Sequence, residues 1–352
     1  MSGQAARVIR KDDDKIWFLE WLRVFACLAV VLIHCFAAYL DKCTVAEAGL
    51  GRALVWTEIL VVFARWAVPA FFMITGTLLL DPARAIGLRK LFGYIKRVAL
   101  ILVIFGTGYA LAQLVFDAHG FNLAMLPAAV CNMLSGKSWS HMWYLYDLLG
   151  IYLLLPLLRA FAANDDRRFY EMFLVALFVF ACVVPTANDL FGLELKNVLW
   201  LGKSVFYVLL GRYLFAYVEI SPRVAAAGIL CLATNAILTG IGITAFGTYW
   251  SALSAPASPF IAGYSAALFL AAKKYCNAPM KRNGVGKAVN RLSFGIYLVH
   301  PVFVNLLYKM LDWPAVPLPP FVFEIATYLL VIVPSALLAL MLTKVPGFRR
   351  LI

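Results

Sequence analysis

Residues 21–36 read WLRVFACLAVVLIHCF, an apolar stretch that carries two ionisable side chains, Arg23 and His34. Apolar residues continue on both sides, enough for a membrane-spanning helix of about 20 residues. A charged side chain within a bilayer costs at least about 2.5 to 3.5 kcal/mol, so such residues are candidate functional sites. At about 100° per residue, the two side chains are separated by three helical turns plus about 20°. The stretch therefore predicts a membrane helix with one functional face.

The composition of the chain is that of an integral membrane protein. Of its 352 residues, 64% are hydrophobic and 14% are charged, whereas the apolar share of a soluble domain is about 45 to 50%. Apolar runs of about 20 residues recur, and they predict helices rather than the short alternating strands of a barrel. We therefore expect an all-α bundle of about ten transmembrane helices. The predicted spans are 17–40, 53–80, 98–116, 139–160, 169–187, 197–218, 224–243, 257–272, 292–312 and 321–343.

The basic residues predict the orientation of the bundle. Net charge is +13, but it is dispersed among short loops and forms no basic face, so we expect no nucleic-acid partner. With the N-terminus inside, 23 of the 31 Lys and Arg residues fall on the cytoplasmic side and four on the outer side. We expect a multi-pass protein with both termini cytoplasmic. Residues 1–16 are its N-terminal tail, 17–343 its one transmembrane domain and 344–352 its C-terminal tail.

The second span repeats the pattern of the first. Glu58 and Arg65 are about 700° apart around a helix and share a face, and Pro69 is expected to kink the span. Glu58 falls at a depth similar to that of His34, and Arg65 lies deeper toward the cytosol. Glu20, three residues before Arg23, is placed to pair with it. Interhelical ion pairs are the structural alternative for the second span, and snorkelling toward lipid phosphates is the alternative for Arg23.

Three further segments supply candidate residues. The basic segment 84–97 includes Lys96 and Arg97, which serve as an orientation signal, an anchor for an anionic ligand, or both. An outer segment, SWSHMWYLYDLLG, includes the residues Trp139, His141 and Trp143, although aromatic belts account for most such residues. Asp147 lies further in and is expected to be paired within the bundle, and His300 lies inside span nine before Pro301.

Seven scattered cysteines, without CxxC or Cys/His spacing, support neither a disulfide framework nor a metal site.

These motifs together resemble the acyltransferase-3 family of bacterial membrane acyltransferases. The resemblance rests on Arg23 and His34, on RWAVPAFFMITG, on MWYLYDLLGIYLLLPLL and on SFGIYLVHP, in that order over residues 17–343. Within the family, the chain is most similar to stand-alone members like the O-acetyltransferase of enterobacterial common antigen. Many members of the family carry Arg-x-x-Arg entering span three, where this chain has Tyr94-Ile-Lys-Arg97, and we predict that Lys96 substitutes for the first arginine.

The resemblance implies an enzyme of the bacterial inner membrane. It would move an acetyl group from cytosolic acetyl-CoA, a substrate rather than a bound cofactor, to a hydroxyl of an envelope glycan or lipid-linked sugar on the outer side. The resemblance also implies that His34 is catalytic and that Arg23 is essential. In the same framework, Trp139, His141 and Trp143 would bind the acceptor.

The spacing of the residues fits this chemistry. The pantetheine arm of CoA is about 15 to 20 Å long, comparable with the rise of roughly 16 Å from Arg23 to His34. Arginine binds phosphate bidentately, and histidine accepts the proton of an attacking hydroxyl. We predict His34 as general base, with Glu58 as its orienter. The predicted donor-binding residues are Arg23, Arg65, Lys96 and Arg97.

Two other classes of function remain open on the sequence. A carrier of a small polar solute would also need charged residues within the membrane. A regulatory or scaffold membrane protein would tolerate apolar residues in place of Arg23 and His34. A covalent acetyl-histidine is the alternative to direct transfer in a ternary complex, and a succinyl or longer donor is not excluded.

Overall fold

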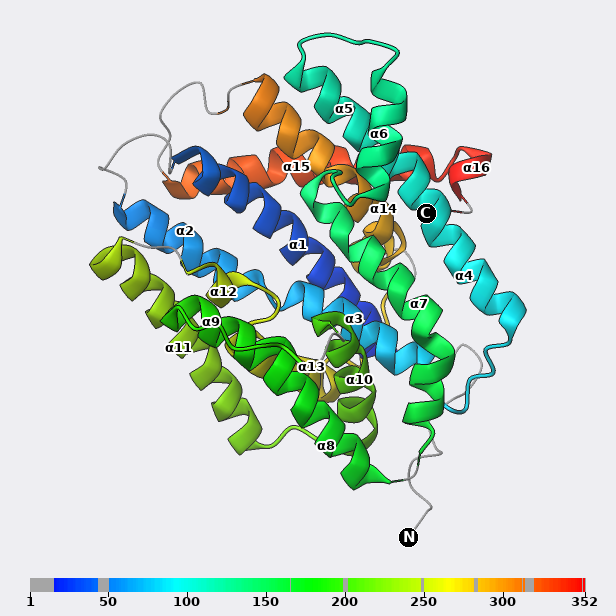
Figure 1. Cartoon of the computed structure of the whole chain (residues 1–352), viewed down its shortest axis with the longest axis vertical. Coiled ribbons are helices and arrows are strands. Elements are labelled where there is room, and N and C mark those ends of the chain that lie inside the picture. Colours follow the sequence, from blue (N-terminus) through cyan, green and yellow to red (C-terminus); the bar gives the residue numbers. More distant parts are fainter. Residues whose placement is uncertain are drawn as a thin grey trace.

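A computed structural model of the chain describes residues 16–43, 51–164, 166–198, 202–247, 250–281, 284–311, 313, 320–349 and 351. Within these ranges all regular structure is helical (Figure 1). The helices in chain order are α1 (Trp17–Cys43), α2 (Gly51–Ala64), α3 (Ala67–Leu79), α4 (Leu88–Ile101), η1 (Leu102–Gly106), α5 (Thr107–Asp117), α6 (Met125–Leu134), η2 (Ser140–Met142), α7 (Trp143–Ala162), α8 (Arg167–Phe178), η3 (Val179–Val183), α9 (Val184–Phe191), α10 (Lys203–Tyr217), α11 (Pro222–Phe246), α12 (Ser251–Ser254), α13 (Pro259–Tyr275), α14 (Val285–Asn305), η4 (Leu306–Met310), α15 (Pro320–Leu342) and α16 (Pro346–Arg349).

The predicted all-α membrane bundle is confirmed. In the described part of the chain, nine helical spans are long and apolar enough to cross a bilayer. Their ranges are Trp17–Ala38, Val55–Leu79, Leu88–Asp117, Ser140–Ala162, Arg167–Phe191, Pro222–Phe246, Ser251–Tyr275, Val285–Met310 and Val322–Leu342. The remaining predicted span, 197–218, corresponds to α10, whose 15 residues extend about 22 Å, less than the hydrocarbon thickness of about 30 Å.

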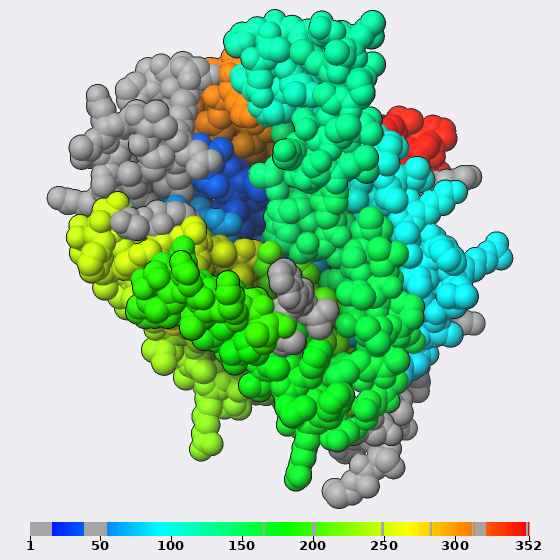
Figure 2. Space-filling model, in the orientation of Figure 1, coloured from blue at the N-terminus to red at the C-terminus, as the bar shows by residue number. Residues whose placement is uncertain are grey.

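Helix α1 lies in the middle of the bundle, where it packs against α2, α3, α13, α14 and α15 (Figure 1). In the space-filling view, α1 comes to this face of the molecule only over a small area between its neighbours (Figure 2). The peripheral helices instead expose apolar side chains, such as Leu153 on α7 and Ile229 on α11. Apolar surface of this extent is what a lipid environment requires. We call the end of the bundle where α1 begins the inner end and the opposite end the outer end, following the predicted orientation.

The second span is broken where the sequence placed a kink. Helix α2 ends at Ala64 and α3 begins at Ala67, with a turn at Arg65 and Trp66. Pro69 has no N–H to donate to the carbonyl of Arg65, four residues earlier, and its ring crowds that carbonyl. The predicted kink therefore follows directly from Pro69.

Two segments differ from the predicted boundaries. Helix α4 begins at Leu88, ten residues before the predicted span, because Leu91 and Val98 bury one face of an otherwise basic segment. The basic residues of segment 84–97 therefore lie partly on a helix rather than in a loop. The longest predicted outer loop, about 117–138, includes the helix α6, which packs against α5 (Figure 1).

Candidate active site

Three imidazole rings meet near the outer half of α1. The ring centroid of His34 lies 5.1 Å from that of His300 and 6.4 Å from that of His141, and the last two are 5.7 Å apart. We call these three residues the histidine cluster. Helices α1 and α14 supply His34 and His300, and η2, which precedes α7, supplies His141. Within the described residues, no His, Cys, Asp or Glu side chains form a group able to hold a metal ion.

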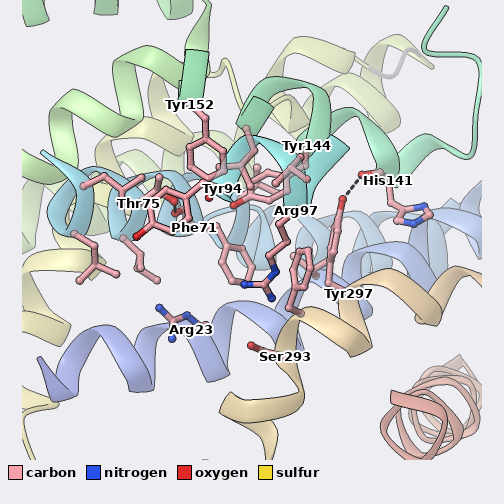
Figure 3. A pocket seen from close by; sticks show the side chains of 18 of the residues that line it. Arg23, Phe71, Thr75, Tyr94, Arg97, His141, Tyr144, Tyr152, Ser293 and Tyr297 are labelled. Atoms are coloured by element: carbon pink, nitrogen blue, oxygen red, sulfur yellow. Dashed lines mark hydrogen bonds between the residues drawn. The ribbon is translucent and has the colours of Figure 1, made fainter. Parts of the chain in front are cut away.

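The two histidines beside His34 are held in place by hydrogen bonds that involve backbone carbonyl groups. His300 is fully buried on α14, and its Nδ1 lies 3.1 Å from the carbonyl oxygen of Ile296. The hydroxyl of Tyr297 donates to the carbonyl oxygen of His141 at 2.7 Å and so ties η2 to α14 (Figure 3). His34 itself is half-buried, and its ring lies in the wall of both cavities described below. Its ring is therefore available to a ligand.

A cavity of about 500 Å³ extends from His34 toward the inner end. Its charged wall residues are Arg23, Arg97 and Arg291, and Figure 3 shows Arg23 and Arg97 directed into it from α1 and α4. Much of the remaining wall is aromatic. These aromatic residues are Phe71, Tyr94, Trp143, Tyr144, Tyr152, Phe294 and Tyr297. The inner cavity therefore has three guanidinium groups and an apolar passage that ends at His34 and His141.

Arg23 belongs to a polar network at the inner end of α1. Its Nη1 lies 3.3 Å from Oε1 of Glu20 and 3.4 Å from Oδ1 of Asn290, and Asn290 in turn donates to Glu20. The predicted pairing of Glu20 with Arg23 is confirmed. The network sets the direction of the Arg23 guanidinium. The positive charge of Arg23 remains only partly compensated, because the same cavity also holds two further arginines.

Arg97 is held by contacts from two different segments. Its Nε donates to the carbonyl oxygen of Leu351 at 2.8 Å, and its guanidinium lies over the ring of Phe294, 5.3 Å from the centroid. These contacts fix the side chain at the wall of the inner cavity. Lys96, the preceding residue, is exposed and does not line the cavity.

A second cavity, of about 590 Å³, extends from the histidine cluster toward the outer end. Its polar wall residues are His34, Gln113, Ser138, Trp139, Ser140, His141, Asn305, Tyr308 and Lys309. Trp139 stacks on Tyr109 at 4.3 Å between centroids, and its Nε1 is buried without a hydrogen-bond partner among the described residues. The outer cavity thus offers amide, hydroxyl and indole groups suited to a polyhydroxylated ligand. Both cavities have His34 and His141 in their walls.

Other predicted site residues lie away from the two cavities. Glu58 is buried on α2 but lines neither cavity. Arg65 is half-buried at the break between α2 and α3, and its Nε has no hydrogen-bond partner among the described residues. A similar depth along the membrane normal therefore does not place Glu58 in the wall of a cavity. The roles predicted for Glu58 and Arg65 stay predictions.

Trp143 and Asp147 lie in the first turns of α7. Trp143 lines the inner cavity rather than the outer one, and the Nζ of Lys203 lies 4.7 Å from its ring centroid. Asp147 accepts a hydrogen bond from the hydroxyl of Ser204 on α10. The predicted pairing of Asp147 within the bundle is therefore confirmed.

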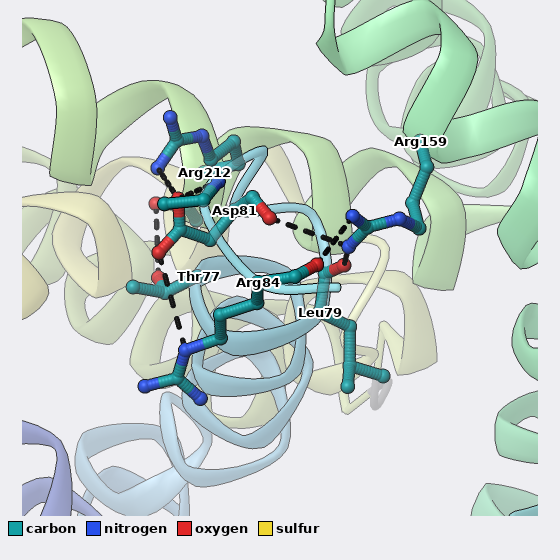
Figure 4. Close-up of polar contacts among 8 residues, drawn as sticks. Thr77, Leu79, Asp81, Arg84, Arg159 and Arg212 are labelled. Carbon is teal, nitrogen blue, oxygen red and sulfur yellow. Dashed lines mark hydrogen bonds and ion pairs between the residues drawn. The ribbon is translucent and has the colours of Figure 1, made fainter. Parts of the chain in front are cut away.

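Arg159 closes the inner end of α3 beside the cavity. Its guanidinium donates to the carbonyl oxygens of Leu79, the last residue of α3, and of Asp81 and Arg84, which follow that helix (Figure 4). The Asp81 carboxylate forms ion pairs with Arg84 at 3.9 Å and with Arg212 at 3.8 Å. Leu79 lines the inner cavity, so this cluster fixes part of its wall.

Several wall residues were not singled out by the sequence. Arg291 counted only as an orientation charge, and Asn290, Gln113 and Lys309 gave no signal because each is an ordinary polar residue near a helix end. Tyr297 lies within SFGIYLVHP, so its motif was noted but its contact with His141 was not. These residues reach the site through the packing of α1, α5 and α14, which no local pattern encodes.

Comparison with known proteins identifies one family. The family model described as an acyltransferase domain, of the acyltransferase-3 type, matches residues 16–343. Comparisons with curated proteins and with solved structures found no match.

Proposed function

The chain belongs to the acyltransferase-3 family of membrane proteins, and we propose that it transfers an acetyl group from acetyl-CoA to a hydroxyl of a cell-envelope glycan. The proposed location is the bacterial inner membrane, with both termini in the cytoplasm. The proposed relatives in function are stand-alone members like the O-acetyltransferase of enterobacterial common antigen.

One observation carries the proposal. Two cavities approach the histidine cluster from opposite ends of the bundle, and both have His34 in their walls. The inner cavity is rich in arginine, as binding of the donor phosphates requires. The outer cavity is rich in neutral hydrogen-bonding groups, as a sugar requires. A group at the junction can contact both substrates at once.

In the proposed mechanism, Arg23, Arg97 and Arg291 hold the phosphates of acetyl-CoA. The pantetheine arm lies along the aromatic wall of the inner cavity and brings the thioester to His34. There the imidazole removes the proton from the acceptor hydroxyl as its oxygen attacks the thioester carbonyl carbon. The C–S bond breaks, and the CoA thiolate takes the proton from His34. The products are the O-acetyl ester and free CoA, without a covalent enzyme intermediate.

Variants of His34 test the catalytic role. We expect His34→Ala to lower acetyl transfer by about 10²- to 10⁴-fold, the usual contribution of general base catalysis, while acetyl-CoA still binds. Transfer is measured with purified protein in vesicles, using radiolabelled acetyl-CoA and envelope glycan. His119→Asn is the matched control, because His119 lies in the segment between α5 and α6, outside both cavities. Full activity of His34→Ala would remove His34 from the mechanism.

A carrier of a small polar solute is the second candidate, because two polar cavities that share wall residues also suit alternating access. Binding of acetyl-CoA separates the two functions. An acyltransferase binds it in an Arg23-dependent way, whereas a carrier of an unrelated solute does not. A scaffold protein would retain its function in both Arg23→Ala and His34→Ala.

The chemical route is a separate question. Accumulation of enzyme with an acetylated histidine in the absence of acceptor would favour the acetyl-histidine route over direct transfer.

A further inference from the structure

We propose that His300 is the positioning residue of His34: its Nε2 accepts the N–H of His34 and so selects the tautomer in which His34 can act as base. The inference rests on the proposed function for its catalytic consequence. It assigns to His300 the role that the sequence suggested for Glu58.

The tautomer of His300 follows from its hydrogen bond. The Nδ1 of His300 lies 3.1 Å from the carbonyl oxygen of Ile296, and a carbonyl oxygen only accepts hydrogen bonds. The proton must therefore be on Nδ1. The side chain is fully buried, and its Nε2 has no partner among the described residues. A charged imidazolium would be costly there without a counter-ion, so the ring is neutral and its Nε2 carries a lone pair.

The ring of His34 lies close enough to donate an N–H to the lone pair on Nε2 of His300. The rings of His34 and His300 have centroids 5.1 Å apart at an interplanar angle of 47°. A small rotation of His34, or one water molecule, completes an N–H···N hydrogen bond across this separation. The bond would leave the other nitrogen of His34 unprotonated and directed to the substrates.

Nearby hydroxyl groups are already committed to backbone carbonyls. Tyr297 donates to His141, Tyr109 donates to Leu298 at 2.6 Å, and Tyr308 donates to Cys35 at 3.2 Å. The ring of His141 is further from His34, with 6.4 Å between centroids against 5.1 Å for His300. His300 is thus the closer of the two rings beside His34, and its lone pair has a fixed direction.

The chemical consequence concerns the second proton of His34. A base that accepts a proton from the acceptor hydroxyl becomes an imidazolium with two N–H groups. One N–H then returns its proton to the CoA thiolate, and the other remains hydrogen-bonded to Nε2 of His300. No net proton is consumed by the pair, because the proton that His34 accepts is the one that the thiolate receives.

A pair of conservative variants tests the role. His300→Asn keeps an amide N–H near the position of Nδ1, able to bond Ile296, but has no acceptor at the position of Nε2. His300→Gln places its amide oxygen near Nε2. We expect His300→Asn to lower kcat by about 10- to 100-fold with an unchanged KM for acetyl-CoA, and His300→Gln to restore much of kcat. Equal losses in both variants, or a kcat of His300→Asn within twofold of wild type, would overturn the proposal.

NMR spectroscopy identifies the histidine tautomers without requiring enzymatic turnover. The chain has four histidines, so ¹⁵N-histidine NMR of the protein in lipid yields few signals, which single substitutions assign. We expect His300 protonated on Nδ1 only, and His34 as one tautomer in the wild type but as a mixture in His300→Asn. Protonation of His300 on Nε2 would contradict the proposal. If the wild-type protein transfers no acetyl group, the proposed function is wrong. The NMR measurement would still show whether His34 and His300 are hydrogen-bonded to each other.

Discussion

At the scale of single residues, the neighbours Lys96 and Arg97 show how a helix separates two adjacent positive charges. Both side chains are exposed, but Arg97 lies at the wall of the inner cavity, held by Leu351 and Phe294, whereas Lys96 does not line the cavity. Successive side chains on a helix point about 100° apart, so only one of the two faces the cavity. The structure therefore gives no support to the prediction that Lys96 substitutes for the first arginine of the family motif in donor binding.

We expect Arg97→Ala to weaken acetyl-CoA binding by about 10- to 100-fold, because a charge-assisted hydrogen bond is worth about 1.5 to 3 kcal/mol. Lys96→Ala, one residue away, is expected to change it by less than about threefold, since Lys96 lies outside the cavity wall and solvent and salt screen its charge there. Isothermal titration calorimetry with acetyl-CoA at fixed ionic strength measures both. A larger loss in Lys96→Ala than in Arg97→Ala would show that the donor phosphates lie outside the inner cavity.

Periodicity within one helix predicted part of this site correctly. Arg23 and His34 were placed on one face of a single helix, and both line the inner cavity. Glu58 was matched to His34 by depth alone, and it lines neither cavity. Depth gives a position along the membrane normal, but the direction of a side chain around its helix depends on how two helices pack. The turn at Arg65 and Trp66 adds a further change of direction.

At the scale of helices, the tightest contact described is that between α3 and α10. A Cβ atom added at Gly211 would overlap the backbone of Met73, and one added at Gly76 would overlap the backbone of Val208. The hydroxyl of Thr77 also donates to the carbonyl oxygen of Gly211 at 3.2 Å. Small residues that let two backbones touch are a common device in membrane helix packing. This contact holds the short helix α10 against the helix that forms one wall of the inner cavity.

Replacing Gly211 by alanine is expected to destabilise the bundle by about 1 to 3 kcal/mol, because the added methyl group has no space beside Met73. Gly150→Ala on α7 is the matched control, since a Cβ there meets no atom within 4 Å. In that control, alanine should leave the stability unchanged or raise it by up to about 1 kcal/mol through its helix propensity. Thermal unfolding in detergent, followed by size-exclusion chromatography, compares the two. Equal melting temperatures would show that α3 and α10 do not touch in this way.

The limits of prediction at this scale have physical causes. Long apolar runs gave the existence of the spans, and Pro69 gave the break. The start of α4 was missed because its first turns are amphipathic and basic, and hydropathy registers only the average of the two faces. Helix α10 was predicted as a full span because its sequence is apolar, whereas its length is set by its buried position against α3.

At the scale of the whole molecule, the proposed function depends on the two ends of the bundle facing different compartments. An arginine-lined cavity can receive acetyl-CoA only if the inner end faces the cytosol, and a glycan can enter the outer cavity only from the other side. Neither cavity was predictable as a volume, since each is enclosed by side chains from helices far apart in the sequence. The count of basic residues in the loops nevertheless gives a definite expectation for which end is which.

Two native cysteines make the orientation measurable. Cys131 on α6 is exposed near the outer end, and Cys276, which follows α13, is partly exposed on the predicted cytosolic side. In variants that retain one of them and replace the other six cysteines, a membrane-impermeant maleimide added to spheroplasts should label Cys131. It should label Cys276 only after permeabilisation. The reverse pattern would place Arg23 and Arg97 on the side without acyl-CoA, and the acetyl-CoA-dependent mechanism would then fail for lack of a donor.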